Sequence, residues 1–286
     1  MRESRPASFK CSAVISDVDG TLMTDDKILT PLAQVAATEL RANGIIFSIV
    51  SSRPPRGLQM LISSLGITAP VAGFNGGVLT SPDLSVISAH LLPAGVARAA
   101  VGMLKARQVQ VWVFSGSDWL VRQSDAPYIE LEERTVGFGP VVVDDFAGGL
   151  GSTAKIVGVS PDFELLAQCE YDLRTSLADQ ACVVRSQPYY LDITHPLANK
   201  GVAVAEIAKL LGLPLREIAT IGDGANDVAM FERSGLSIAM ANAAPEVQNR
   251  ADFVTETNRE DGFAHAMTHI ILGGSQAKAA KAGGRG

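Results

Sequence analysis

The sequence of 286 residues lacks several features that would point to particular classes of protein. It has only three cysteines, Cys11, Cys169 and Cys182, which are far apart and lack metal-binding spacing, so we expect reduced thiols. Its 24 lysines and arginines are outnumbered by 30 aspartates and glutamates, and the formal net charge is −6. We therefore expect no nucleic-acid partner, because binding of a phosphate backbone needs a concentrated basic face.

Long apolar segments are missing as well. Runs such as residues 44–50 are much shorter than the roughly 20 residues that span a bilayer. Residues 1–6 lead into no apolar signal core, so we expect a cytoplasmic protein without membrane contact. Charged residues at 19% and hydrophobic residues at 47% are typical of a globular protein, whose partner we expect to be a small molecule.

Residues 14–22 contain the most informative pattern. A short β-branched run ends at Asp17, Asp19 follows two residues later, and Gly20 allows the chain to turn sharply. Two like charges gain nothing from burial, so we interpret the pair as acids that share a divalent cation and a reaction. The alternative is a strand that ends in an Asx-type turn. A calcium loop is excluded, because its pattern would need glycine where Leu22 stands.

The order of the elements predicts the fold. A strand at 12–16, a helix at 31–42, a continuous apolar strand at 45–50 and a second helix to residue 65 alternate in the manner of parallel βαβ units. This rhythm resumes after residue 200 with further helices and strands. The pattern predicts a doubly wound, Rossmann-like α/β core whose ligands bind beyond the carboxyl ends of the strands.

A different rhythm separates the two parts of this core. Between residues 83 and 187, paired strands are mixed with helices, which fits an α+β module. We therefore expect a core domain at 11–82 and 188–272 and an inserted cap domain at 83–187. The remaining residues, 1–10 and 273–286, are expected to be flexible termini.

Residues 222–227 again place carboxylates at the end of an apolar strand. Asp223 and Asp227 lie among glycines, but the order of a dinucleotide-binding loop is absent, which excludes that class. Together with the first pair they provide four acids at one sheet edge, which suits a hard cation such as Mg²⁺. A phosphate bound there would need further donors, for which Lys200 and Ser51 are candidates.

In these motifs the chain resembles the haloacid dehalogenase superfamily, and within it the Cof-type phosphatases that carry a large inserted cap. The four motifs appear in order as residues 17–22, Ser51, Lys200 with Gly201, and residues 222–227. Shorter similarities bring the coverage to most of residues 12–272, although the cap matches only in size and pattern. One departure is Ser52, where the branch usually has a glycine.

The resemblance implies a phosphomonoester hydrolase for a small phosphorylated metabolite, with sugar phosphates as the leading class. It implies that Asp17 is the nucleophile, forming an aspartyl-phosphate, and that Asp19 is the general acid and base. It implies Mg²⁺ as cofactor, held by Asp17, the backbone carbonyl of Asp19, Asp223 and Asp227. The phosphate-binding residues it implies are Ser51, Lys200, Asn226 and Thr21, and the candidate substrate contacts are Arg53, Asn75 and Asn242.

Two other functions remain open from the sequence. A phosphosugar mutase would rebind its intermediate, and a non-catalytic metal- or phosphate-binding regulator would not need both Asp17 and Asp19. In the cap, four aromatic residues could either stack on a substrate or belong to the core: Trp112, Trp119, Tyr189 and Tyr190. Arg122 and Arg185 are weaker substrate candidates, and His195 is interpreted as a spacer before the third motif.

Overall fold

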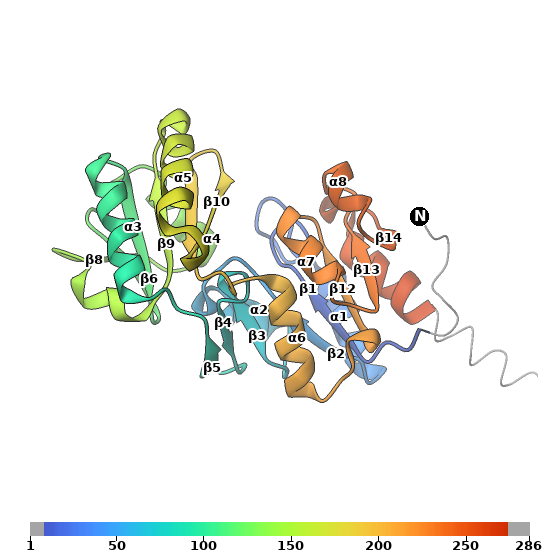
Figure 1. The fold of residues 1–286 in the computed structure, drawn as a ribbon. Coiled ribbons are helices and arrows are strands. Elements are labelled where there is room, and N and C mark those ends of the chain that lie inside the picture. Colours follow the sequence, from blue (N-terminus) through green and yellow to red (C-terminus); the bar gives the residue numbers. More distant parts are fainter. Residues whose placement is uncertain (1–8, 274–286) are drawn as a thin grey trace, which may run out of the picture.

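The computed structural model describes residues 9–273, which form two lobes (Figure 1). One lobe holds the blue and the orange-to-red parts of the chain, and the other holds the green-to-yellow part. Most of the predicted flexible termini lies outside the described residues. Of their described part, Phe9 is buried in the core and Lys10 forms an ion pair of 2.9 Å with Glu217.

A five-stranded parallel sheet forms the centre of the first lobe, in the order β14-β13-β12-β1-β2. Its strands are β1 (Ala13–Ser16), β2 (Ile46–Ile49), β12 (Ile218–Gly222), β13 (Leu236–Ala239) and β14 (Phe253–Val254). The predicted α/β core with a parallel sheet is confirmed. Because β1 lies directly beside β12, the loops that follow these two strands meet at one edge.

Helices cover both faces of this sheet. The helices of this lobe are α1 (Pro31–Ala42), α2 (Gln59–Leu65), α6 (Lys200–Leu211), α7 (Val228–Phe231), α8 (Pro245–Gln248) and α9 (Gly262–His265), followed by a π-helical segment (Ala266–Leu272). Successive residues of β1 point to opposite faces of the sheet. Val14 belongs to a hydrophobic cluster formed with α1, α2 and α9, and Ile15 belongs to one formed with α6 and α7. Helix α1 begins as predicted, since the Thr30 hydroxyl accepts a hydrogen bond from the Ala33 amide at 3.2 Å.

The cap is a separate six-stranded sheet in the order β10-β11-β9-β6-β7-β8. Its strands are β6 (Gln110–Ser115), β7 (Asp118–Val121), β8 (Val141–Val142), β9 (Thr153–Val159), β10 (Cys182–Gln187) and β11 (Tyr190–Thr194). Helices α3 (Ala94–Ala106) and α5 (Phe163–Leu177) pack on one face, and α4 (Ile129–Val136) packs on the other. The predicted mixture of hairpins and helices is therefore present as an α+β cap.

Two strands, β11 and β5 (Val86–Ala89), pair with strands of the domain other than the one in which their residues were expected. Strand β11 was expected to start the returning core, but it pairs with β9 and β10 in the cap sheet. A three-stranded sheet of β3 (Val71–Gly73), β4 (Val78–Thr80) and β5 runs past residue 82. Across residues 9–273, the helices are too short or too polar for any of them to traverse a bilayer.

Candidate active site

Asp17 and Asp19 follow the central strand of the core. The Asp17 amide donates to Ile221 of β12 at 2.9 Å, so the parallel pairing continues to the start of the acidic loop. Gly20 then turns the chain with φ of +82°, a conformation that favours glycine. A Cβ atom at this position would lie 2.3 Å from Asp223 Oδ2, so any side chain here would displace the Asp223 carboxylate.

Asp223 and Asp227 reach the same edge from β12. The backbone amides of Asp223 and Gly224 donate to Asp227 Oδ2 at 3.0 and 2.8 Å, which fixes this carboxylate. One carboxylate oxygen each of Asp17, Asp223 and Asp227 lies within 4.8 Å of the others. The side chain of Asp19 does not belong to this group among the described residues, so only its backbone carbonyl is left to act as the predicted ligand.

Lys200 sits among these acids. It is the first residue of α6, where Asn199 caps the helix by accepting a hydrogen bond from the Gly201 amide at 2.8 Å. Lys200 Nζ lies 2.5 Å from Asp17 Oδ1 and 2.6 Å from Asp227 Oδ1, and its side chain is 1% exposed. Burial disfavours its charge, but the two carboxylates hold the pKa of Lys200 above its ordinary value.

One lysine does not offset three carboxylates. Burial and the charge of Asp227 raise the pKa values of both Asp17 and Asp223. The cluster thus has oxygen ligands and uncompensated negative charge, both of which a hard divalent cation such as Mg²⁺ would satisfy. These residues fit the predicted metal.

Asp19 has a different environment. Arg53, itself buried, donates from Nε to Oδ2 at 2.7 Å and from Nη2 to Oδ1 at 2.6 Å, and Lys27 Nζ adds a third contact at 2.7 Å. Burial acts to raise the pKa of Asp19, yet these two cations hold it below its ordinary value. Sequence reasoning missed Lys27. The only signal was a lysine within the polar loop after the first motif.

The remaining predicted residues fall into two groups. Asn226 and Asn75 line the central cavity and are joined by a hydrogen bond from Asn226 Nδ2 to Asn75 Oδ1 at 2.9 Å. Among the described residues that line this cavity, Thr21, Ser51 and Asn242 are absent. Their interactions are with the surrounding loops: Thr21 Oγ1 donates to Asp223 Oδ1 at 3.0 Å, Ser51 Oγ accepts from the Arg53 amide at 3.1 Å, and Asn242 Nδ2 donates to the Gly20 carbonyl at 2.9 Å.

The cavity has a volume of about 720 Å³ and is lined by residues of both lobes. Its core wall consists of the acids and cations described above. Its cap wall includes Tyr128, Glu132, Lys155, Tyr189, Tyr190 and Asp192. The rings of Tyr128 and Tyr189 stack with centroids 4.2 Å apart, and Tyr190 donates its hydroxyl to Glu132 at 3.0 Å.

Of the other cap residues considered from the sequence, Trp112 and Arg185 line the cavity. Trp119 is fully buried within the aromatic cluster of the cap. Arg122 donates to the Val143 carbonyl at 3.1 Å, and His195 stacks on His90 with ring centroids 5.6 Å apart.

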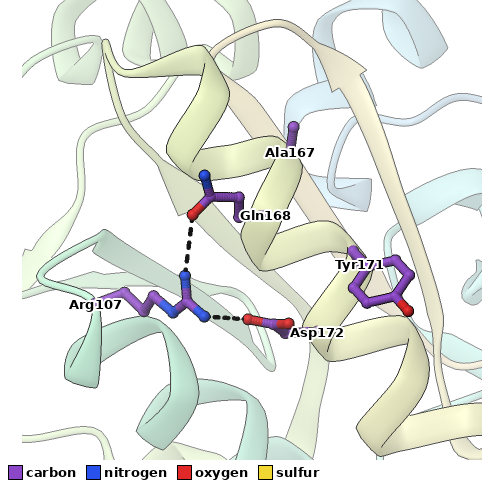
Figure 2. A pocket seen from close by; sticks show the side chains of 5 residues that line it. All are labelled: Arg107, Ala167, Gln168, Tyr171 and Asp172. Atoms are coloured by element: carbon purple, nitrogen blue, oxygen red, sulfur yellow. Dashed lines mark hydrogen bonds and ion pairs between the residues drawn. The ribbon is translucent and has the colours of Figure 1, made fainter.

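A second hollow lies on the face of the cap that carries α3 and α5 (Figure 2). It measures about 380 Å³ and is lined by Arg107 and four residues of α5. Arg107 reaches across it to Gln168 and Asp172, so its charge is already paired, and Tyr171 is largely exposed. This hollow brings together no set of acids comparable to the central cavity.

Comparison with known proteins identifies the family to which this chain belongs. The family model of haloacid dehalogenase-like hydrolases matches residues 14–267. The chain belongs to this family. The predicted recognition is confirmed, and with it the predicted class of enzyme, since the named relatives are phosphatases.

These relatives match the haloacid dehalogenase-like chain over most of its length. The putative phosphatase YxeH of Bacillus subtilis is 28% identical, over 90% of this chain and 97% of its own. The 5-amino-6-(5-phospho-D-ribitylamino)uracil phosphatase YwtE of the same organism is 25% identical, over 93% and 99%. A haloacid dehalogenase-like hydrolase from Bacteroides thetaiotaomicron superposes with a TM-score of 0.85 at 26% identity, covering 91% of this chain and 99% of that one.

Proposed function

We propose that this phosphatase hydrolyses the phosphomonoester of a small sugar phosphate or related metabolite, with Mg²⁺ as cofactor and an aspartyl-phosphate intermediate. The observation that carries the proposal is the buried contact of Lys200 with Asp17 and Asp227 beside Asp223. The predicted division into core and cap gives each lobe a role. The core, predicted as 11–82 and 188–272, performs the chemistry without β11, which joins the predicted cap, 83–187, in covering the leaving group.

Asp17 is the nucleophile in this proposal. Its carboxylate is held by Lys200 at 2.5 Å and faces a cavity that can admit a phosphate ester. Attack of a carboxylate oxygen on phosphorus forms the aspartyl-phosphate and breaks the bond to the leaving oxygen. Bound Mg²⁺ would offset the repulsion between this anionic nucleophile and the dianionic ester, and its ligands would be Asp17, Asp223, Asp227 and the Asp19 carbonyl.

Asp19 then transfers the protons. As general acid it protonates the leaving oxygen, and as general base it deprotonates the water that opens the aspartyl-phosphate. Its bidentate contact with Arg53 holds the carboxyl group in one orientation but also favours the ionised form, so the acid role requires that Asp19 takes up a proton as Arg53 turns to the bound phosphate. Arg53 and Lys27 also line the cavity, so both can contact the transferring phosphate once Asp19 carries a proton.

The other predicted residues complete the phosphate site. Lys200 and Asn226 line the cavity and supply donors to the transferring oxygens. Ser51 and Thr21 act from the supporting loops, Thr21 through its hydrogen bond to Asp223. Asn75 lines the cavity, where it contacts the substrate and is held by its hydrogen bond with Asn226. Asn242 acts indirectly, through its hydrogen bonds to the Gly20 carbonyl and to Asp223.

The test is release of phosphate from a panel of sugar phosphates and from p-nitrophenyl phosphate, with Mg²⁺ and with EDTA. Asp17→Asn should lower turnover by a factor on the order of 10⁴ or more, because the nucleophile is lost. Asp26→Asn, an exposed acid of the same region, serves as the matched control and should retain activity. Full turnover by Asp17→Asn would refute the nucleophile, and an isomerised sugar phosphate without free phosphate would indicate a mutase.

A further inference from the structure

The cap wall of the cavity contains a charged group that the chemistry of the core does not use. Glu132 comes from α4, Lys155 from β9 and Asp192 from β11, and all three line the cavity. Lys155 and Asp192 are 5% and 7% exposed, and Lys155 Nζ lies 2.8 Å from Asp192 Oδ1. Burial of such groups is costly unless they are paired or serve a ligand.

Each cation that lines the cavity already has a carboxylate partner. On the core wall, Lys27 and Arg53 contact Asp19, and Lys200 contacts Asp17 and Asp227. On the cap wall, Lys155 pairs with Asp192, while Arg185 donates to Glu170 of α5 at 2.8 Å. One divalent cation and one dianionic phosphate add equal and opposite charge. Within the described residues the cavity therefore holds no unpaired lysine or arginine for a second anion.

The cap wall carries two acids, Glu132 and Asp192, and two cations, Lys155 and Arg185. Both cations are paired with acids other than Glu132, and among the described residues no ion pair involves Glu132. Burial raises the pKa of Glu132, and Asp192 raises it further, although Lys155 and the Tyr190 hydroxyl act in the opposite direction. The pKa of Tyr190 lies well above its ordinary value because the residue is buried beside Glu132 and Asp192. An anionic ligand group would meet the same repulsion as the tyrosinate.

Two buried polar atoms on this wall lack hydrogen-bond partners among residues 9–273. Asp192 Oδ1 has only its ion pair with Lys155, without hydrogen-bond geometry, and Trp112 Nε1 has no acceptor. Both residues flank Val157 in the strand register, so they share one row and one face of the cap sheet. Both atoms are closed off from solvent, so this row places an unsatisfied acceptor and an unsatisfied donor just behind the surface of the cavity.

We propose that, within the sugar-phosphate class of the proposed function, the leaving group is uncharged and carries no second phosphate or carboxylate. The inference rests on the proposed function, since it concerns the alcohol that the phosphatase releases. Hydroxyl groups donate to Glu132 and Asp192, and the stacked rings of Tyr128 and Tyr189 form an adjoining part of the wall. A second anion would face the two acids without a free cation, which rejects acidic substrates.

Glucitol 6-phosphate and 6-phosphogluconate test this directly, because they differ only in a terminal hydroxymethyl or carboxylate group. With the full chain and Mg²⁺, we expect kcat/KM to favour glucitol 6-phosphate by about 100-fold. Glu132→Gln keeps an acceptor for Tyr190 but removes one negative charge, and should narrow the ratio to about tenfold. Glu130→Gln, an exposed acid of the same helix paired with Arg134, should leave the ratio unchanged.

If neither compound is hydrolysed, glucitol 6-phosphate and 6-phosphogluconate can be compared as inhibitors of p-nitrophenyl phosphate hydrolysis. Their inhibition constants should then differ in the same direction. Equal or better use or binding of 6-phosphogluconate by the wild-type protein would overturn the inference. A ratio that Glu132→Gln leaves unchanged would overturn the role of this wall. Failure to hydrolyse p-nitrophenyl phosphate with Mg²⁺ is a separate result, which would overturn the proposed function itself.

Discussion

The two walls of the cavity hold charge in different ways. On the core wall, Asp17, Asp223 and Asp227 converge from loops after two adjacent parallel strands, and a single lysine among them leaves negative charge uncompensated. On the cap wall, Lys155 and Asp192 form a buried pair beside Glu132, and these residues come from three separate elements. In the function that we propose, the first wall takes up a cation and a phosphate, and the second distinguishes a neutral leaving group from an acidic one.

The largest effect is expected from removing Lys200, the lysine that lies among the three acids of the core wall. Lys200→Ala leaves Asp17 and Asp227 buried without their partner, and breaking such a buried pair costs about 3–5 kcal/mol. We also expect turnover to fall on the order of 10³-fold, because a donor to the transferring phosphate is lost. Urea unfolding and phosphate release measure the two effects.

Lys209→Ala is the matched control, since Lys209 lies on the same helix and is exposed. It should change stability by about 0.5 kcal/mol or less, as is usual for surface positions. If Lys200→Ala were as stable and active as Lys209→Ala, the core wall would not depend on charge compensation.

On the cap wall, Glu132→Gln is expected to change how the stability of the protein depends on pH. The folded-state pKa of Glu132 is raised above its ordinary value of 4.5, so the folded protein binds this proton more tightly than the unfolded chain. The stability linked to that proton is complete below pH 4.5 and is lost as the pH rises through the folded-state pKa. Glutamine does not ionise, so at pH 7 the variant should be more stable than the wild type, by about 1 kcal/mol.

Urea unfolding at pH 7 and at pH 4 would show this difference at the higher pH alone. Glu130→Gln, whose side chain is 89% exposed, should show it at neither. Lower stability of Glu132→Gln at pH 7 would mean that the ionised carboxylate stabilises the cap, contrary to the acidic environment inferred for this wall.

The smallest effect is expected at the hollow on the other side of the cap. Arg107→Ala removes the contacts with Gln168 and Asp172, which are partly exposed and therefore contribute at most about 1 kcal/mol (Figure 2). Phosphate release should not change, because Arg107 is separated from the cavity by the cap sheet. A loss of turnover together with unchanged unfolding would connect this hollow to catalysis.

Much of the core could be predicted from the sequence because its signals are local. Thr30 and Pro31 mark the start of α1, and the acids of the first and fourth motifs directly follow apolar strands. In a parallel sheet the carboxyl ends of neighbouring strands share an edge, so local positions imply spatial proximity. The acidic cluster was predictable for this reason, and Lys200 was a candidate because it starts a predicted helix and supplies a positive charge.

The cap wall could not be predicted in the same way. Lys155 and Asp192 are single charged residues on otherwise uncharged strands, and Glu132 lies in a helix with two other acids. Which of them face a cavity depends on antiparallel register and on the packing of α4, and neither is encoded locally. The aromatic residues were equally ambiguous, since Trp119 belongs to the core while Tyr189 and Tyr190 line the cavity.

The sequence by itself determined the α/β core, the family and the acids of the first and fourth motifs, because strand periodicity and motif spacing are local properties of the chain. The tertiary structure alone decided that Arg53 and Lys27 hold Asp19, that β11 belongs to the cap, and that Glu132, Lys155 and Asp192 share one wall. Those contacts join elements far apart in the chain. Their geometry follows from how the sheets and helices pack, which no local pattern specifies.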